Sequence, residues 1–464
     1  MHPGGEKMKS QCAENSDSLP KRIGKFQLRN KTVLIPEMNH IAAHLIAATY
    51  RSFGVNGVVL PTYHGLDLGK KYTSGKECFP CQVTLGDILL FLKTEQKQLG
   101  KAFNPDNYLY FLPESDGPCR FGMYNKYQRM VLDSFPELDR VKIVSITAKD
   151  GYSLEGVIEQ DRILEFRKES YIAVIVADIM ERLLWRIRPY EKKKGIADEF
   201  IERSMGEMES LLETHGVHSK LDRILNKLEE IAHHGKQLID PSIPKRPLIG
   251  IVGEIFLRMH VKSNQNLIRL LEKYGAEVVN SSLAEWLNYI NYGQVRENKV
   301  NFRLHFRQLN LRRLRKYLHK IISFGGQLIY QERRQKQFYR CAARLIDFEH
   351  DHKVSHLEKI LKQNDIFTFD ITTETCLSIA AILQFVDQGY NGVVNVYPFA
   401  CMPGMTTAAI VKPILNRRRI PYLDTFYDGS YQPGREAALR TFMHQVTQHY
   451  ERYGRKGNFQ QYAS

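Results

Sequence analysis

Short apolar runs alternate with helix-like stretches along much of the chain, and this alternation restricts the fold more than any other feature. The first run, Lys31 to Pro36, has the character of a strand; a helical pattern from Ile41 to Ser52 and a second strand from Gly57 to Leu60 follow it. Strand, helix and strand in this order are typical of a parallel sheet, because parallel strands need a crossover connection. The sequence therefore predicts an α/β fold.

The alternation falls into two blocks, residues 31–150 and residues 245–464. Further strands are expected at Tyr108–Leu112, Val141–Ile146, Leu248–Val252, Glu277–Val279, Ile366–Phe369 and Gly392–Val396. Helices are expected at Ile88–Glu95, Tyr127–Leu132, Asn266–Tyr274, Cys376–Gln388 and Arg435–Gln448. We predict one parallel-sheet lobe from each block, without a repeat of solenoid period.

The segments outside these two lobes differ in composition. Residues 1–30 are polar and predict a flexible N-terminal segment. In residues 151–244, charged residues and Leu or Ile recur at three- and four-residue spacing, which predicts a helical insert that ends in a stretch with several prolines. Residues from about 282 to 350 form a basic, helical section within the second lobe.

Length and composition indicate a folded, soluble chain. Its 464 residues suffice for several lobes, and 43% hydrophobic with 25% charged residues is close to the average of globular proteins. The first residues lack the apolar core of a secretion signal, and no apolar run reaches the roughly 18 residues of a membrane span. We therefore expect a cytoplasmic protein without membrane contact. In that reducing compartment the seven cysteines are metal ligands, redox thiols or small buried side chains rather than disulfides.

Three loops that contain cysteine carry the strongest chemical signal. They are Gly75–Cys81, Gly117–Gly122 and Tyr397–Gly404. All are rich in Gly and Pro, and each follows an expected strand or precedes an expected helix, where α/β sheets hold their sites. The first stands before a helix expected at Thr84–Lys93, and the amides at a helix start stabilise a thiolate. The candidate ligands are Cys78, Cys81, Cys119 and Cys401.

Thiolates bind soft metals, and four of them commonly hold an iron-sulfur cubane. A zinc ribbon would require a second close pair of Cys or His, and no second C-x-x-C is present. Cys341 and Cys376 lie inside helical patterns, where a cysteine is more often a small buried side chain, and we keep both as reserve ligands. Cys12, in the polar N-terminal segment, is expected to be an exposed thiol.

Two other functions stay open at this point. A C-x-x-C at a helix start also suits a dithiol oxidoreductase, although that function leaves Cys119 and Cys401 unexplained. The 66 basic and 51 acidic residues give a net charge of +15, which could attract nucleic acid or an acidic protein. The densest basic run contains Arg303, Arg307, Arg312, Arg313, Arg315 and Lys316. Such a run is more often a solvated helix face above a buried apolar face than a nucleic-acid groove.

The three cysteine loops together resemble the activase-associated branch of the 2-hydroxyacyl-CoA dehydratase superfamily, the proteins related to CoA-substrate-specific enzyme activases. The double-cubane-cluster proteins belong to the same superfamily. The resemblance runs from about Lys31 to Val446 and includes Gly253–Arg258, followed by Asn264 and Asn266, and Pro421–Leu423, followed by Asp428 and Arg435. Several motifs in one order are far more specific than a single C-x-x-C.

This resemblance implies two Rossmann-like lobes with an oxygen-sensitive iron-sulfur cluster between them. It implies Cys78, Cys119 and Cys401 as ligands, with Cys81 as the fourth. It also implies a partner, a separate ATP-hydrolysing activase that carries its own cluster and supplies low-potential electrons. The chain itself has neither a P-loop nor a G-x-G-x-x-G, which agrees with the entry of energy through another protein.

We therefore expect the electron-accepting iron-sulfur component of an ATP-dependent reductase or 2-hydroxyacyl-CoA dehydratase-type system. One [4Fe-4S] cluster is the favoured cofactor; without Cys12, six cysteines would also supply three ligands to each cubane of a double-cubane cluster. No residue can be matched to catalysis on a CoA ester, and the insert has no counterpart in the dehydratase subunits. The substrate, the catalytic residues and assembly into a homo-oligomer stay open.

Overall fold

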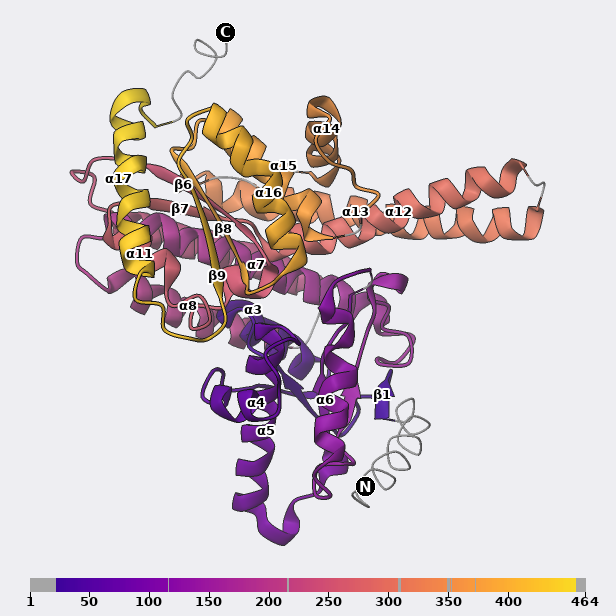
Figure 1. Cartoon of the computed structure of the whole chain (residues 1–464). Helices are drawn as coiled ribbons and strands as arrows, with labels where there is room; N and C mark the ends of the chain where they lie inside the picture. Colours follow the sequence, from indigo (N-terminus) through magenta and orange to yellow (C-terminus); the bar gives the residue numbers. More distant parts are fainter. Residues whose placement is uncertain are drawn as a thin grey trace, which may run out of the picture. The chain divides into compact units, whose positions relative to one another are not determined.

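The computed structural model describes residues 22–115, 117–214, 217–307, 310–348, 351, 353–371 and 373–455 (Figure 1). The chain divides into two compact units. Unit 1 comprises the residues up to 37 together with 50–166, and unit 2 comprises residues 38–49 and 167–464. Most of the N-terminal segment that we expected to be flexible, including Cys12, lies outside the described residues.

Unit 1 contains a parallel sheet of five strands in the order β1-β5-β4-β2-β3. Its strands are β1 (Ile23–Gly24), β2 (Thr32–Ile35), β3 (Asn56–Val59), β4 (Tyr108–Phe111) and β5 (Lys142–Val144). The helices that follow these strands along the chain are α3 (His40–Ser52), α4 (Leu66–Lys71), α5 (Phe79–Leu99) and α6 (Tyr124–Asp133). The strands expected in this block are therefore confirmed, and β1 is an additional edge strand.

Unit 2 contains a second parallel sheet, with four strands in the order β7-β6-β8-β9. Its strands are β6 (Leu248–Gly253), β7 (Glu277–Asn280), β8 (Gly392–Pro398) and β9 (Tyr422–Tyr427). The helices from β6 onward are α10 (Ile255–Met259), α11 (Leu267–Lys273), α12 (Leu283–Arg307), α13 (Leu311–Ala343), α14 (Val354–Asn364), α15 (Glu374–Asp387), α16 (Met402–Arg417) and α17 (Arg435–Tyr453). The prediction of an α/β protein with two parallel sheets is confirmed.

The strand expected at Ile366–Phe369 is wrong. These residues form the connection between α14 and α15, and α14 ends at Asp365 in a left-handed backbone conformation. Phe369 is buried, and Ile366 and Phe367 pack against the same apolar cluster. The apolar run therefore reflects side chains that cover neighbouring helices and not a strand that pairs in the sheet.

The two sheets share one strand order. Without the short β1, the first sheet runs β3-β2-β4-β5 and the second runs β7-β6-β8-β9. In chain order, both place the second strand at one edge, then the first, third and fourth strands. Ligands of such sheets bind beyond the carboxyl ends of the first and third strands, where the chain turns off in opposite directions. This rule points to the loops that follow β2 and β4 in unit 1, and β6 and β8 in unit 2.

The central strands of the second sheet show why their sequences are continuously apolar. Every residue of β6 and β8 is buried, because helices cover both faces of a parallel sheet. At the end of β6 the two strands come so close that a Cβ on Gly253 would lie 1.9 Å from the carbonyl oxygen of Val396. Gly253 also has φ +123°, so the close approach and the backbone both require glycine.

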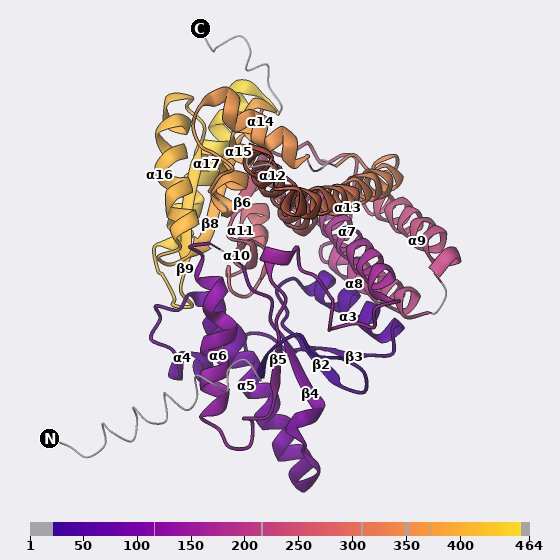
Figure 2. The same ribbon diagram turned by 90° about the vertical axis from the view of Figure 1, so that its right-hand side faces the viewer.

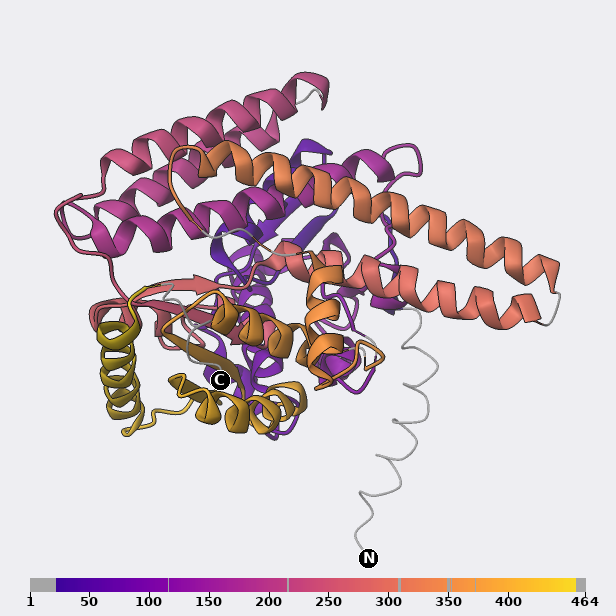
Figure 3. The same ribbon diagram turned by 90° about the horizontal axis from the view of Figure 1, so that it is seen from above.

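Long helices form a further layer of unit 2. They are α8 (Ile196–Glu213), α9 (Val217–Gln237), α13 and most of α7 (Ile163–Ile187), and Figure 2 shows α9 beside α13. Their buried side chains form one apolar cluster, to which Ile41, Ala42, Leu45 and Ala48 of α3 also belong. The helix pair α12 and α13 extends beyond the sheet of unit 2 (Figures 1 and 3). No helix within the described ranges combines the length and the apolarity that a membrane span requires.

Candidate functional site

Cys78 and Cys81 lie at the start of α5. Cys78 is the residue directly before the helix, and Pro80 occupies the second helical position, where a missing amide proton does no harm. The backbone of Cys78 has φ 108° and ψ 145°, a conformation that residues with a side chain rarely adopt. Holding such a residue there costs roughly 1–3 kcal/mol, and strained residues of this kind gather at functional sites. The Cys81 amide donates to the Cys78 carbonyl at 3.1 Å, so one tight turn holds both cysteines.

Cys119 lies at the same edge of the first sheet. It follows the carboxyl end of β4 and precedes a short 3-10 helix, Arg120–Met123. The first turn of α5 also lies at this edge, because α5 runs back across the sheet between the parallel strands β3 and β4. The Arg120 guanidinium joins the two loops by donating to the Lys76 carbonyl at 2.5 Å. Unit 1 thus gathers three of the four candidate ligands at one edge.

Burial dominates the chemistry of the C-x-x-C thiols. Cys81 is 0% exposed and Cys78 is 7% exposed, and both belong to the apolar core of unit 1. Burial raises the pKa of the Cys81 thiol to about 12, against the opposing hydrogen bond from Gln128. In the absence of metal, burial therefore outweighs the stabilisation of a thiolate that we expected at a helix start. A bound metal reverses this balance, because a thiol gives up its proton when it becomes a ligand.

The side chain of Gln128, in α6, contacts Cys81. Its Nε2 lies 2.8 Å from Thr84 Oγ1, 3.4 Å from the Cys81 carbonyl oxygen and 3.8 Å from Cys81 Sγ. A hydrogen bond to a ligating sulfur is one of the means by which a protein sets a cluster's reduction potential. Sequence reasoning missed this residue, although its position four residues after Tyr124 and four before Leu132 places it on the buried face of α6.

Asp87 fixes the loop after β3 to α5. Its Oδ2 accepts a hydrogen bond from Thr62 Oγ1 at 2.7 Å, and its Oδ1 accepts one from the Tyr63 amide at 2.8 Å. Burial raises the pKa of this carboxyl group to about 7. The backbones meet at two glycines, since a Cβ on Gly86 would lie 2.0 Å from the carbonyl oxygen of Gly65. These contacts hold the segment that leads into the C-x-x-C turn.

Cys401 belongs to unit 2 and lies between β8 and α16. It is the residue directly before α16, it is 6% exposed, and its carbonyl accepts the Met405 amide at 2.9 Å. The preceding Ala400 has φ +56°, in the left-handed region. Around this buried cysteine, Phe399, Met402 and Met405 are 56%, 41% and 53% exposed. The loop therefore presents an apolar rim around a buried thiol.

The two reserve cysteines also belong to unit 2. Cys376 is 0% exposed in the first turn of α15, and its thiol contacts the Thr373 carbonyl at 3.1 Å and the Tyr289 hydroxyl at 3.5 Å. Burial raises its pKa to about 12. Cys341 lies in α13, and its thiol contacts the Leu225 carbonyl at 3.4 Å. Both have the surroundings of structural cysteines, although Thr375, beside Cys376, donates to the carbonyl of Pro403 in the Cys401 loop at 3.2 Å.

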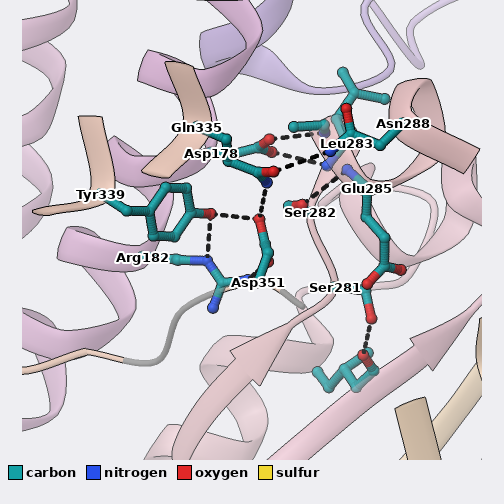
Figure 4. A network of polar contacts seen from close by, with 12 residues as sticks. Asp178, Arg182, Ser281, Ser282, Leu283, Glu285, Asn288, Gln335, Tyr339 and Asp351 are labelled. Carbon is teal, nitrogen blue, oxygen red and sulfur yellow. Dashed lines mark hydrogen bonds and ion pairs between the residues drawn. The ribbon is translucent and has the colours of Figure 1, made fainter. Parts of the chain in front are cut away.

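Unit 2 also contains a buried polar network that sequence reasoning missed (Figure 4). Asp178 of α7 accepts the amides of Leu283 and Ala284, both at 2.8 Å, and so caps α12. Arg182, one turn further along α7, donates to the Tyr339 hydroxyl at 3.0 Å and forms an ion pair with Asp351. Tyr339 donates to Asp351 Oδ2 at 2.6 Å, and this network joins α7, α12 and α13.

This network holds protons near neutral pH. Burial raises the pKa of Asp178 to about 7, with a further contribution from the negative charge of Asp351. Burial likewise raises the pKa of Glu285 to about 7. A cavity of about 20 Å³, enough for one water molecule, adjoins Glu285, Asn280 and Gln384. Asn280 Oδ1 and Gln384 Oε1 accept no hydrogen bond from the described part of the protein, so this space is polar.

One signal could have revealed the network. Asp178 and Arg182 stand four residues apart within the long apolar run of α7, where a charged side chain can be buried only if it is paired. Asp351, in contrast, lies in the connection after α13, far along the chain. Its part in the network could be found only from the fold.

A scan against protein-family models and a search of curated proteins find no match to this chain. The resemblance to the 2-hydroxyacyl-CoA dehydratase superfamily therefore rests on the motifs of the chain itself.

Proposed function

We propose that this chain holds an iron-sulfur cluster through Cys78, Cys81, Cys119 and Cys401. As the electron-accepting component, it would serve an ATP-dependent low-potential reductase or a 2-hydroxyacyl-CoA dehydratase-type system. The observation that carries the proposal is the turn at Cys78. A strained backbone holds this cysteine directly before α5, with Cys81 one helical turn away and the Cys119 loop tied to the same segment by Arg120.

The donors of unit 1 fit such a cluster. Thiols are the ligands that iron-sulfur clusters take, and these thiols lie at the edge of the core, where burial protects an oxygen-sensitive centre. Gln128 offers an N–H to the sulfur of Cys81. Bound there, a cluster would supply one-electron transfer at low potential. The protein's own residues orient the thiols, exclude water and set the charge around them.

Cys401 is the proposed fourth ligand. It comes from unit 2, so its participation would place the cluster between the two lobes, as the resemblance implies. Support comes from its position: Cys119 lies in the loop after β4 and Cys401 in the loop after β8, the corresponding strands of the two sheets, and each cysteine directly precedes a helix. These two loops occupy corresponding positions in the two sheets and each contains one cysteine, so both are suited to supply a ligand.

Dithiol exchange is less well supported. A catalytic dithiol needs an accessible thiolate, and its attacking cysteine has a lowered pKa. The first cysteine of the motif, Cys78, would have to attack, and it is only 7% exposed. This burial opposes exchange with an external disulfide, whereas it does not prevent a metal from replacing the proton of a thiol.

The proposed partner is a separate ATP-hydrolysing activase in the cytoplasm. The chain has no phosphate-binding motif, so the energy that drives an electron to low potential would enter through that partner. Redox partners commonly meet through small, charge-complementary contacts. The net charge of +15 favours an acidic partner.

Anaerobic purification followed by iron and acid-labile sulfide analysis tests the proposal. We expect about four irons per chain and broad visible absorption, as for one [4Fe-4S] cluster. Cys119→Ser and Cys401→Ser should each lower the iron content, because each removes a ligand. Cys341→Ser is the matched control, since the thiol of this cysteine contacts the carbonyl of Leu225 in α9. A protein without iron, with a titratable dithiol at Cys78 and Cys81, would instead be an oxidoreductase.

The partner is tested separately. Reduction by dithionite should require purified activase and ATP, and a salt series should slow it if charge brings the two proteins together. Reduction that proceeds equally well without activase or ATP would refute the partner and leave the cluster assignment intact.

A further inference from the structure

The helix α13 has two seams of side chains, and α12 covers only the first. The inner seam consists of Leu314, Tyr317, Ile321, Phe324, Leu328, Gln331, Gln335 and Phe338, at alternating three- and four-residue spacing. Asn291 donates to Gln331 at 2.8 Å and Asn288 donates to Gln335 at 2.9 Å, so this seam faces α12. The inner seam therefore explains the pairing of the two helices.

The outer seam has the same spacing on another face of α13. Its members are Leu311, Arg315, Leu318, Ile322, Gly325 and Ile329. The four large apolar side chains, Leu311, Leu318, Ile322 and Ile329, are 78%, 47%, 65% and 53% exposed. An exposed face of a two-helix arm is normally polar, and a row of exposed apolar side chains marks an interaction surface.

The geometry of the outer seam is suited to one more helix. Spacing of four and three residues is the heptad pattern of a coiled coil, with Ile322 and Ile329 at one core position and Leu311 and Leu318 at the other. A Cβ on Gly325 would meet nothing within 4 Å, so the seam has an open notch where another backbone can come close. The seam is a narrow stripe, whereas a helix that lies on a lipid surface needs a broad apolar face.

The basic residues around the outer seam indicate which kind of helix can bind there. From Asn298 to Gln331 the sequence contains no Asp or Glu, and it contains Lys299, Arg303, Arg307, Arg312, Arg313, Arg315, Lys316 and Lys320. Arg312, Arg315 and Lys316 are exposed and form no ion pair with the residues that the structure describes. Arg315 stands within the seam itself, where a partner would desolvate it and would have to offer a carboxylate. A second copy of this arm would place like charges opposite one another.

We propose that the outer seam of α13 binds an α-helix of a partner protein whose apolar stripe is flanked by Asp and Glu. This inference does not depend on the iron-sulfur cluster. It gives the basic section of the chain a specific use, recognition of an acidic amphipathic helix.

Two synthetic peptides of about four heptads test the proposal. Both carry Ile and Leu at the core positions; one has Glu and the other has Lys at the flanking positions. Fluorescence anisotropy with the full-length protein at physiological ionic strength measures binding. We expect the Glu peptide to bind and the Lys peptide not to bind. The double variant Leu318→Ser/Ile322→Ser should weaken binding about tenfold or more.

A matched control is Leu164→Ser, since Leu164 is also exposed, at 62%, but lies on α7. Its binding should equal that of the unchanged protein, and circular dichroism confirms that each variant is folded. Equal binding of both peptides, no binding of the Glu peptide at about 100 μM, or full binding by the double variant overturns the proposal. Two further results also overturn it: tighter binding to vesicles of phosphatidylserine and phosphatidylcholine than to the Glu peptide, and a dimer that the double variant abolishes.

Discussion

Cys81 and Cys376 occupy corresponding positions beside the two sheets, which have the same strand order apart from the additional edge strand β1. Each is the third residue of the helix that precedes the third strand, α5 before β4 and α15 before β8. The residue before the helix differs, because Cys78 stands there in unit 1 and Thr373 stands there in unit 2. The second unit therefore has T-x-x-C at the helix start where the first unit has C-x-x-C.

This relationship makes Cys376 the informative cysteine for the number of clusters. With one [4Fe-4S] cluster, Cys376→Ser should leave the iron content unchanged, because this thiol lies against the Thr373 carbonyl and the Tyr289 hydroxyl instead of a cluster. The hydroxyl can keep these contacts, so we expect a stability loss of only about 1 kcal/mol. About eight irons in the unchanged protein, with about half lost in this variant, would establish a double cubane instead.

Gln128 should affect the reduction potential of the proposed cluster. Gln128→Leu removes the N–H that lies 3.8 Å from Cys81 Sγ, and loss of a donor to a ligating sulfur makes the cluster harder to reduce. We expect a more negative midpoint potential at unchanged iron content, measured by anaerobic dye titration. Gln82→Leu is the control, since Gln82 is also buried but donates to Thr73 at 2.9 Å. Equal shifts in both variants would assign the effect to general polarity.

Asp178 should make the protein less stable as pH rises. Burial raises its pKa from 3.8 to about 7, so between these values the unfolded chain has released a proton that the native protein still holds. The free energy of unfolding therefore falls across this range, by an amount on the order of a few kcal/mol. In Asp178→Asn the free energy of unfolding, measured by urea denaturation at a series of pH values, should fall less steeply. A part of the fall should remain, because burial also raises the pKa of Glu285. Asp67→Asn, at an exposed position, is the control. If the free energy of unfolding falls with pH as steeply in Asp178→Asn as in this control, the assignment is wrong.

The strands β6 and β8 lie too close together at Gly253 for a side chain at this position. Gly253→Ala places a Cβ 1.9 Å from the Val396 carbonyl oxygen and forces φ +123° on alanine. We expect a loss of at least about 2–3 kcal/mol in urea unfolding. Gly206→Ala is the control, because this helical glycine has nothing within 4 Å and alanine should stabilise α8 by about 0.5–1 kcal/mol. Similar stability of the two variants would show that the sheet relaxes.

The strands could be predicted from the sequence where an apolar run corresponds to a strand that is buried on both faces. The continuous apolar runs of β4, β6 and β8 could be recognised because these strands are buried on both faces. The run at Ile366–Phe369 has the same composition but packs against helices, and composition alone cannot distinguish these two uses. β9 was missed because only two of its six residues are buried.

The candidate site could be predicted only as loops. Gly- and Pro-rich segments next to strands identified Cys78, Cys119 and Cys401, because loop composition is local information. The contact from Arg120 to Lys76 and the approach of Gln128 to Cys81 join residues more than 40 positions apart. Such contacts follow from strand order, which a single sequence does not state. The network around Asp178 depends on the fold in the same way.

The division of the chain into units has a consequence for synthesis. Residues 38–49 belong to unit 2, although unit 1 surrounds them in the sequence. Their apolar residues Ile41, Leu45 and Ala48 pack in a cluster with residues of α7 that follow more than 120 positions later. At roughly 5–20 residues per second, the ribosome would leave this apolar face uncovered for several seconds. The start of α3 is therefore a segment of the nascent chain that a chaperone would need to protect.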